Sequence, residues 1–323
     1  PHLTPALVLS QSPSILETKN SLDLLEILGN LTYEDGNLTY EDGNQTLPAY
    51  DEAAHYDAAP CHNQYCAFFQ RLAPAFLAGA CAAAALATGM LLVALVKWPH
   101  AWGWPQSRAL VAQLAMGTGL FAAALPAVAA GIGYGWRLGR GLCKLTHLLW
   151  HWSLFAQGLL VGTSSCSTVW CRWDPRSRRL AVALWVGALV LATPAALASG
   201  TAEVTNTNCL RRSVDVLSPT YLVYLTLCLG LFLLLPAALP VATLAVPRLR
   251  EGWEPGVCVS WLFFGLWVPY GLGLAVDFLL HTQLLQPTCG TFQHFDFVLG
   301  ACEGLGVLHA CLGPAALLAA GLA

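Results

Sequence analysis

The sequence predicts an all-α protein built as a seven-transmembrane helix bundle. Hydrophobic residues make up 56% of the chain and charged residues 10%, with a mean hydropathy of +0.58. Ordinary soluble domains are about a quarter charged. Seven long apolar stretches, separated by short polar connections, follow an acidic N-terminal segment. Lipid is therefore the expected environment of most of the chain.

Each apolar stretch is long enough for one membrane crossing, because a helix needs roughly 20 residues to span the hydrocarbon layer. Helices are expected because a backbone in lipid must satisfy its own polar groups, and these runs lack the alternation of barrel strands. An odd number of spans places the N-terminal segment and the C-terminus on opposite sides. In chain order, the expected spans are 72–96, 107–130, 142–171, 180–200, 219–246, 257–281 and 293–322.

The N-terminal segment carries a tandem repeat that sets the orientation. Residues 30–46 read NLTYEDGNLTYEDGNQT, and each start of the unit is a glycosylation sequon, at Asn30, Asn37 and Asn44. Glycosylation fixes such a segment on the extracellular or lumenal side. We therefore expect residues 1–66 to form an extracellular, glycosylated and largely disordered tail, and residues 67–323 to form the helix domain.

This tail is strongly acidic. Residues 1–60 contain ten acids and one lysine, a local charge of −9, in a chain whose net charge is −3. Several of its tyrosines stand next to acids, which makes them candidates for sulfation and for contacts with a basic ligand. A solvated stalk without a ligand is the alternative reading. The candidate ligand-binding residues of the tail are Tyr40, Tyr50, Asp51, Glu52 and Tyr56.

Five of the twelve cysteines are expected at or beyond the outer ends of the spans. The others lie within spans, where cysteine usually packs as a small apolar residue. Because an extracellular surface is oxidising, disulfides are expected there. Cys143 with Cys209 makes one natural pair, and Cys61 with Cys289 makes a second that ties the tail to the last span. Cys66 is left over and can compete with Cys61, so the connectivity stays open.

This arrangement resembles the chemokine receptors of the rhodopsin-like class, in which one bridge joins the third helix to the second outer loop and another joins the tail to the seventh helix. Segments 303–314, EGLGVLHACLGP, and 120–126, LFAAALP, are similar to that family's seventh and second helices. Segments 59–62, APCH, and 275–280, AVDFLL, are most similar to its atypical members. Matching landmarks within the helices are Trp185, Pro236, the LWVPY of residues 266–270, and Pro314.

Three signalling motifs of the resembled class are altered together. The third helix should end in Asp-Arg-Tyr, the second should carry a sodium-coordinating aspartate, and the seventh should read Asn-Pro-x-x-Tyr. The joint loss implies a receptor that binds a ligand without coupling to a G protein. In the same order, the residues at those positions are Ser167, Thr168 and Val169, then Thr118, then Gly313, Pro314 and Leu317.

Ionisable residues inside the spans are functional candidates, because lipid makes them costly. Glu303 lies about eleven residues into the last span, roughly 16 Å deep at 1.5 Å per residue. The resemblance implies an anchor for a basic ligand segment, and pairing with a neighbouring helix is the alternative. Asp277 is a second pocket acid or an interfacial one. His147 and His151 have a spacing able to hold zinc, but without a third ligand we expect packing and no metal.

The resemblance implies an atypical, decoy or scavenger chemokine receptor that binds basic CC and CXC chemokines. A conventional G-protein-coupled chemokine or peptide receptor is the alternative. We expect a multi-pass plasma-membrane protein with an extracellular N-terminus. Early or recycling endosomes as a further location, and homo- or hetero-oligomers with other receptors, are both compatible with the sequence. No lysine follows Lys144 to bind retinal, and no protease nucleophile motif is found. We therefore expect no enzyme activity, cofactor or nucleic-acid partner.

Overall fold

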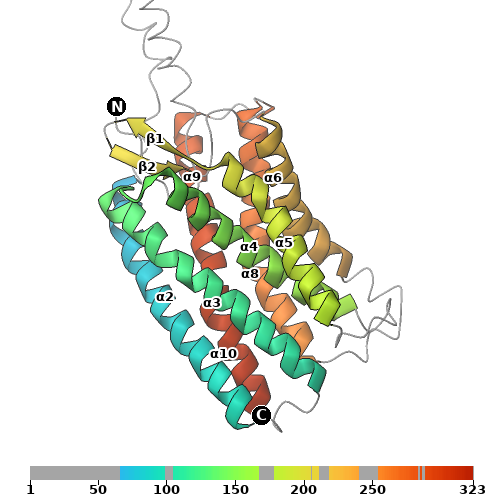
Figure 1. Ribbon diagram of the computed structural model, residues 1–323. Helices are drawn as coiled ribbons and strands as arrows, with labels where there is room; N and C mark the ends of the chain where they lie inside the picture. The colour runs from blue at the N-terminus through green and yellow to red at the C-terminus, as the bar shows by residue number, and fades with distance from the viewer. Residues whose placement is uncertain are drawn as a thin grey trace, which may run out of the picture. The chain divides into compact units, whose positions relative to one another are not determined.

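The computed structural model of the protein shows a bundle of long helices with a two-stranded hairpin at one end (Figure 1). The structure describes residues 66–98, 105–166, 178–204, 206–210, 218–239, 254–282, 284–285 and 288–322. Its helices are α2 (Cys66–Lys97), α3 (Pro105–Tyr134), α4 (Gly139–Cys166), α5 (Arg178–Ala198), α6 (Pro219–Leu229), η2 (Gly230–Leu234), α8 (Glu254–His281), α9 (Cys289–Val307) and α10 (His309–Leu322). The strands are β1 (Gly200–Val204) and β2 (Asn206–Leu210).

Helices that follow one another in the chain pack side by side, and the last returns to the first. α2 packs on α3, α3 on α4, α4 on α5, α5 on α6, α6 on α8 and α8 on α9, while α10 contacts both α2 and α8. α4 also contacts α8 and η2, so it runs through the interior of this ring. The helices share one apolar core of buried side chains.

Six stretches of the described residues are long and apolar enough to cross a membrane: Phe68–Lys97, Arg108–Tyr134, Arg179–Ala198, Pro219–Leu239, Val259–Leu280 and Gly290–Gly321. α4 is the seventh helix of the bundle and is more polar. Its polar residues include His147, His151, Ser153 and Gln157, all buried. An outer helix of the bundle faces lipid, whereas a helix surrounded by other helices faces protein. Such an inner helix tolerates polar side chains, because neighbouring helices can supply their hydrogen-bond partners. The predicted all-α seven-helix bundle is confirmed.

The fifth expected span is not a regular α-helix throughout. After α6, the residues of η2 form a π-helix, and helix continues through 235–239. The N–H of Leu235 donates to the carbonyl oxygen of Gly230, five residues back. Pro236 follows directly, and a proline has no N–H and crowds the preceding turn. A wider turn just before it relieves that crowding.

The seventh expected span corresponds to one membrane-capable stretch, Gly290–Gly321, which contains a turn at Leu308 between α9 and α10. The N–H of Leu308 donates to Leu305 O at 3.2 Å, and that of Cys311 to Leu308 O at 3.0 Å, each three residues back instead of four. The turn between α9 and α10 is therefore tighter than an α-helical turn.

The connection between α5 and α6 contains the two strands, which the all-α prediction did not include. β1 and β2 pair antiparallel, with Thr201 opposite Cys209. Gly200, expected as the last residue of the fourth span, is the first residue of β1. We call this end of the bundle the hairpin end. In Figure 1 the first turns of α4 and α9 lie at the hairpin end, and the end of α10 lies at the opposite end.

Candidate functional site

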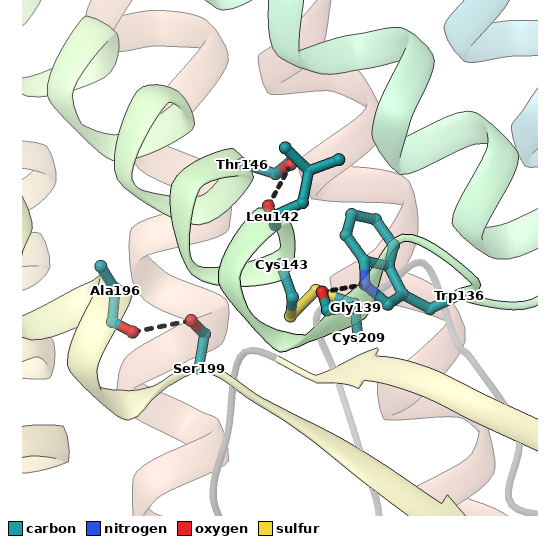
Figure 2. The surroundings of a disulfide bond; sticks show 8 residues. All are labelled: Trp136, Gly139, Leu142, Cys143, Thr146, Ala196, Ser199 and Cys209. Carbon is teal, nitrogen blue, oxygen red and sulfur yellow. Dashed lines mark hydrogen bonds between the residues drawn. A yellow bond between two sulfur atoms is a disulfide. The ribbon is translucent and has the colours of Figure 1, made fainter.

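A disulfide anchors the hairpin to the helices. It joins Cys143 and Cys209, as the sequence predicts, with their Cα atoms 5.6 Å apart. Figure 2 shows Trp136 beside the bond, its indole N–H donating to Gly139 O at 2.8 Å. Gly139 has a φ of 78°, a conformation that glycine adopts without a Cβ penalty. Through the disulfide and its surroundings, β2 contacts both α3 and α4.

Glu303 lies on the buried face of α9. Only 1% of its surface is exposed, and Asp296, Leu299 and Val307 are buried as well. These positions recur at the three- and four-residue spacing of one helix face. α9 begins at Cys289, four residues earlier than expected. Glu303 is therefore fourteen residues from the helix start, about 21 Å along its axis, where the expected start gave roughly 16 Å.

Two more carboxylates are buried closer to the hairpin end. Asp277 is 5% exposed and lies four residues before the end of α8. Its burial argues against an exposed interfacial position. Asp296 is 3% exposed and lies seven residues into α9. Since α8 and α9 pack on each other, two neighbouring helices bring three buried acids into one half of the bundle.

His147 and His151 pack against aromatic side chains and each other. Their ring centroids are 6.3 Å apart, and the ring of His151 meets Tyr224 edge-on at 5.2 Å. Nδ1 of His151 lies 2.8 Å from His147 O. One ligand atom of His147 lies within 4.8 Å of the sulfurs of Cys143 and Cys209. Because those sulfurs form a disulfide, they supply no thiolates for zinc, and packing remains the better reading.

Farther from the hairpin end, two of the altered motifs meet at one cavity. It has a volume of about 20 Å³ and lies between α3, α4, α8 and α10. The motif residues that line it are Thr118, Gly313, Pro314 and Leu317. The Thr118 hydroxyl donates to Leu114 O at 3.0 Å and lies 3.2 Å from Gln157 Oε1. A neutral hydrogen-bonded pair therefore occupies the place where the resemblance implies a carboxylate.

His309 connects this cavity to Trp267. The indole N–H of Trp267 donates to Nδ1 of His309 at 3.2 Å, and the same nitrogen lies 2.7 Å from Gly306 O. Phe121 and Phe263 pack edge-on against the imidazole ring, with centroid distances of 4.9 and 5.3 Å. The ring is thus held from several sides, and it also lines the cavity.

Many predicted site residues lie outside the described part of the chain. They are the sequon residues Asn30, Asn37 and Asn44, the tail residues Tyr40, Tyr50, Asp51, Glu52 and Tyr56, the cysteine Cys61, and the motif residues Ser167, Thr168 and Val169. Cys66 and Cys289 each begin a helix, but their side chains are not among those described. The Cys61–Cys289 bridge therefore stays a prediction.

Among the buried polar residues that sequence reasoning missed, Asp296, Gln157 and His309 matter most to the site. Each stands inside an expected span, so the rule that lipid makes polar groups costly was the signal that could have found them. Asp296 was overlooked because it is close to the start of its span. Gln157 and His309 gain their importance from contacts between helices, which hydropathy does not show.

Comparison with known proteins gives a consistent family. No family model matches the chain. The chain is 34% identical over 318 residues to a protein named Atypical chemokine receptor 1 from Saimiri boliviensis boliviensis, an alignment that covers 95% of this chain and 88% of the relative. It is also 34% identical over 317 residues to the protein of that name from Macaca mulatta, covering 95% and 88%. With the Homo sapiens protein of that name it shares 33% over 298 residues, covering 90% and 85%. The chain therefore belongs to the atypical chemokine receptor 1 family, as a multi-pass plasma-membrane protein built on the rhodopsin-like helix bundle.

Proposed function

We propose that this protein is an atypical chemokine receptor, which binds basic CC and CXC chemokines outside the cell and does not activate G proteins. The observation that carries the proposal is the neutral cavity of the bundle. Thr118, Gly313 and Leu317 line it, at positions where the resemblance implies the polar switch residues of signalling receptors. Membership in the family supports the chemokine as the class of ligand.

The hairpin end is the side proposed to face outward. The three sequons precede α2, which begins at the hairpin end, and glycans are added on the lumenal side of the membrane. A ligand arriving from outside then meets the half of the bundle that holds Asp277, Asp296 and Glu303. All three are buried, so a basic ligand segment must enter the bundle to reach Glu303.

Binding is proposed to occur in two steps. The tail, with its local charge of −9, first attracts the basic chemokine and raises the encounter rate. Sulfation of Tyr40, Tyr50 or Tyr56 would add acceptors for arginine and lysine, by the same logic as phosphate. The N-terminal segment of the chemokine then enters the bundle and contacts the buried acids. The proposal contains no catalytic step.

Silence toward G proteins follows from population-shift reasoning. A ligand activates a receptor only if the active state makes interactions that the inactive state lacks. In this chain, Thr118 is already hydrogen-bonded to Leu114 and Gln157, and Gly313 and Leu317 have no polar side-chain group to rearrange. Binding energy therefore has no efficient route to a cytoplasmic face that a G protein recognises.

The test measures binding and nucleotide exchange on the same preparation. The full-length receptor is placed in lipid nanodiscs and titrated with labelled CC and CXC chemokines, and saturating ligand is then added with purified G proteins. A known signalling chemokine receptor in the same discs is the control. Saturable chemokine binding without exchange supports the proposal. Robust exchange would make the chain a conventional chemokine receptor, and absence of chemokine binding would reject both readings.

A further inference from the structure

We propose that the cavity between α3, α4, α8 and α10 is a binding site for one buried water molecule. Its volume is about 20 Å³. A water needs roughly 10–15 Å³ of such space, so the cavity holds one and excludes larger ligands. Thr118, Gln157 and His309 provide the polar side chains of its lining, and Val161, Phe263 and Leu317 are among the apolar ones.

His309 supplies the reason for a ligand. The side chain is 2% exposed, and its Nε2 is buried without a hydrogen-bond partner among the described residues. Nδ1, the other ring nitrogen, already contacts Trp267 and Gly306 O. The aromatic rings around the imidazole prevent Nε2 from turning to a distant partner. Because an unsatisfied buried nitrogen is costly, a partner inside the cavity is expected.

Gln157 and Thr118 provide the remaining hydrogen bonds. Nε2 of Gln157 donates to Ser153 O at 3.3 Å, and its Oε1 lies 3.2 Å from the Thr118 hydroxyl oxygen. An amide oxygen and a hydroxyl oxygen each have two lone pairs, so both keep acceptor capacity. Together with Nε2 of His309 they offer about the three partners that buried waters typically have.

A water fits either form of the neutral histidine. If Nδ1 accepts from Trp267, Nε2 carries the ring proton and donates to the water. If Nδ1 instead donates to Gly306 O, Nε2 accepts a proton from the water. Since water both donates and accepts, the site is satisfied in both cases, which an ion of fixed charge does not achieve.

An ion does not fit the lining. None of the residues that line the cavity is an acid, and none is lysine or arginine. A cation or anion there would be buried without a compensating charge, which is strongly unfavourable in a medium of low dielectric. The water completes a neutral polar chain from Trp267 through His309 to Gln157 and Thr118. This chain connects α8, α10, α4 and α3.

The decisive experiment is a crystal structure of the full-length receptor at a resolution that shows ordered water, with one crystal grown in sodium chloride and a second in rubidium chloride. We expect one peak about 2.7–3.2 Å from His309 Nε2 and from an oxygen of Gln157 or Thr118, without anomalous signal from rubidium. An empty cavity would overturn the proposal, and an anomalous peak there would assign a cation in place of water.

A spectroscopic measurement tests the same site in lipid. The receptor is labelled with 15N-histidine, and the resonance of His309 is identified by its loss in His309→Phe. We expect direct magnetisation transfer from water to this buried ring, and its loss in Thr118→Val/Gln157→Met, which removes the polar partners at nearly constant volume. The control is Thr226→Val, since the Thr226 hydroxyl bonds within its own helix on an exposed position. Absent transfer in the wild type, or unchanged transfer in the double variant, would contradict the site.

Discussion

Glu303 is the residue on which the second binding step depends. It is buried in α9, on the same face as Asp296 and Leu299, and therefore faces the interior of the bundle and away from lipid. Keeping a carboxylate in this position is costly in a membrane. Function is a sufficient reason to retain it, because a basic chemokine segment forms charge-assisted hydrogen bonds with a carboxylate that a neutral side chain cannot match.

Replacing Glu303 by glutamine should weaken chemokine binding at least about tenfold. Hydrogen bonds to charged groups contribute about 1.5–3 kcal/mol, and 1.4 kcal/mol is tenfold in affinity. Equilibrium binding in nanodiscs measures the change. Glu303→Asp, which keeps the charge, is the matched control and should retain part of the affinity. Equal affinity of the wild type and Glu303→Gln would remove Glu303 from the binding site.

Gly306 makes room for Trp267 at the end of α9. A Cβ at this position would lie 2.8–2.9 Å from three ring atoms of Trp267. The ring cannot withdraw easily, because it stacks on Phe232 with a centroid distance of 5.2 Å and donates to His309. The close approach of these helices therefore requires glycine here.

We expect Gly306→Ala to lower the free energy of unfolding by about 1–3 kcal/mol, the usual range for overpacking a core. Gly79→Ala is the control, because a Cβ at Gly79 meets nothing within 4 Å and alanine favours a helix by up to about 1 kcal/mol. Thermal unfolding of both variants in one detergent gives the comparison. Equal melting temperatures of Gly306→Ala and Gly79→Ala would show that the Trp267 ring can move aside at little cost in free energy.

At the scale of the elements, the hairpin depends on one covalent link. β1 and β2 are short strands, and an isolated two-stranded hairpin is marginally stable in water. The bond from Cys143 to Cys209 ties β2 to the first turn of α4, and the packing of Trp136 on it adds an apolar contact. The hairpin therefore owes its fixed position to the bundle beneath it.

Breaking this disulfide should cost about 2–5 kcal/mol and reduce both surface expression and chemokine binding. Cys143→Ser, Cys209→Ser and the double variant should lose similar amounts, because either single change already breaks the bond. Flow cytometry on intact cells measures expression and binding together. Cys81→Ser is the control, since this cysteine is not in a disulfide and its thiol donates to Ala122 O, which a serine hydroxyl can also do. If the double variant shows much lower expression or binding than either single variant, one of the two cysteines has a role besides the disulfide.

At the scale of the whole molecule, charge is divided between the tail and the helix domain. Residues 1–60 have a net charge of −9 and the whole chain has a net charge of −3, so the remaining residues have a net charge of about +6. Such a separated charge acts mainly on the rate of encounter with a basic ligand, and added salt screens it over a Debye length of about 10 Å at 0.1 M.

Neutralising six tail acids should slow chemokine association at low salt and flatten its dependence on salt, with little change in the melting temperature. The acids are Glu34, Asp35, Glu41, Asp42, Asp51 and Glu52. Stopped-flow or surface plasmon resonance measurements over a range of salt concentrations give the rates. A tail with the same acids in scrambled order is the control for charge alone. If neutralisation leaves the low-salt association rate unchanged, steering by the tail is wrong.

The bundle could be predicted well because lipid imposes a simple rule on each helix separately. The expected start of the second span at residue 107 lies close to the observed Pro105, and that of the fourth at residue 180 lies close to Arg178. The prediction failed where the backbone departs from an α-helix. Neither the π-helix at Gly230–Leu234 nor the tight turn at Leu308 has a hydropathy signal.

The sequence by itself determined the class of the protein, because hydrophobic length, sequons and charge act locally and can be read residue by residue. It also identified the altered motif positions, such as Thr118 and Gly313. Only the tertiary structure decided what those positions contact. Thr118 contacts Gln157, which is 39 residues away in the sequence, and Trp267 contacts His309, which is 42 residues away. Such pairs depend on how separate helices pack, and the free energy of that packing is a property of the assembled bundle that no single segment carries.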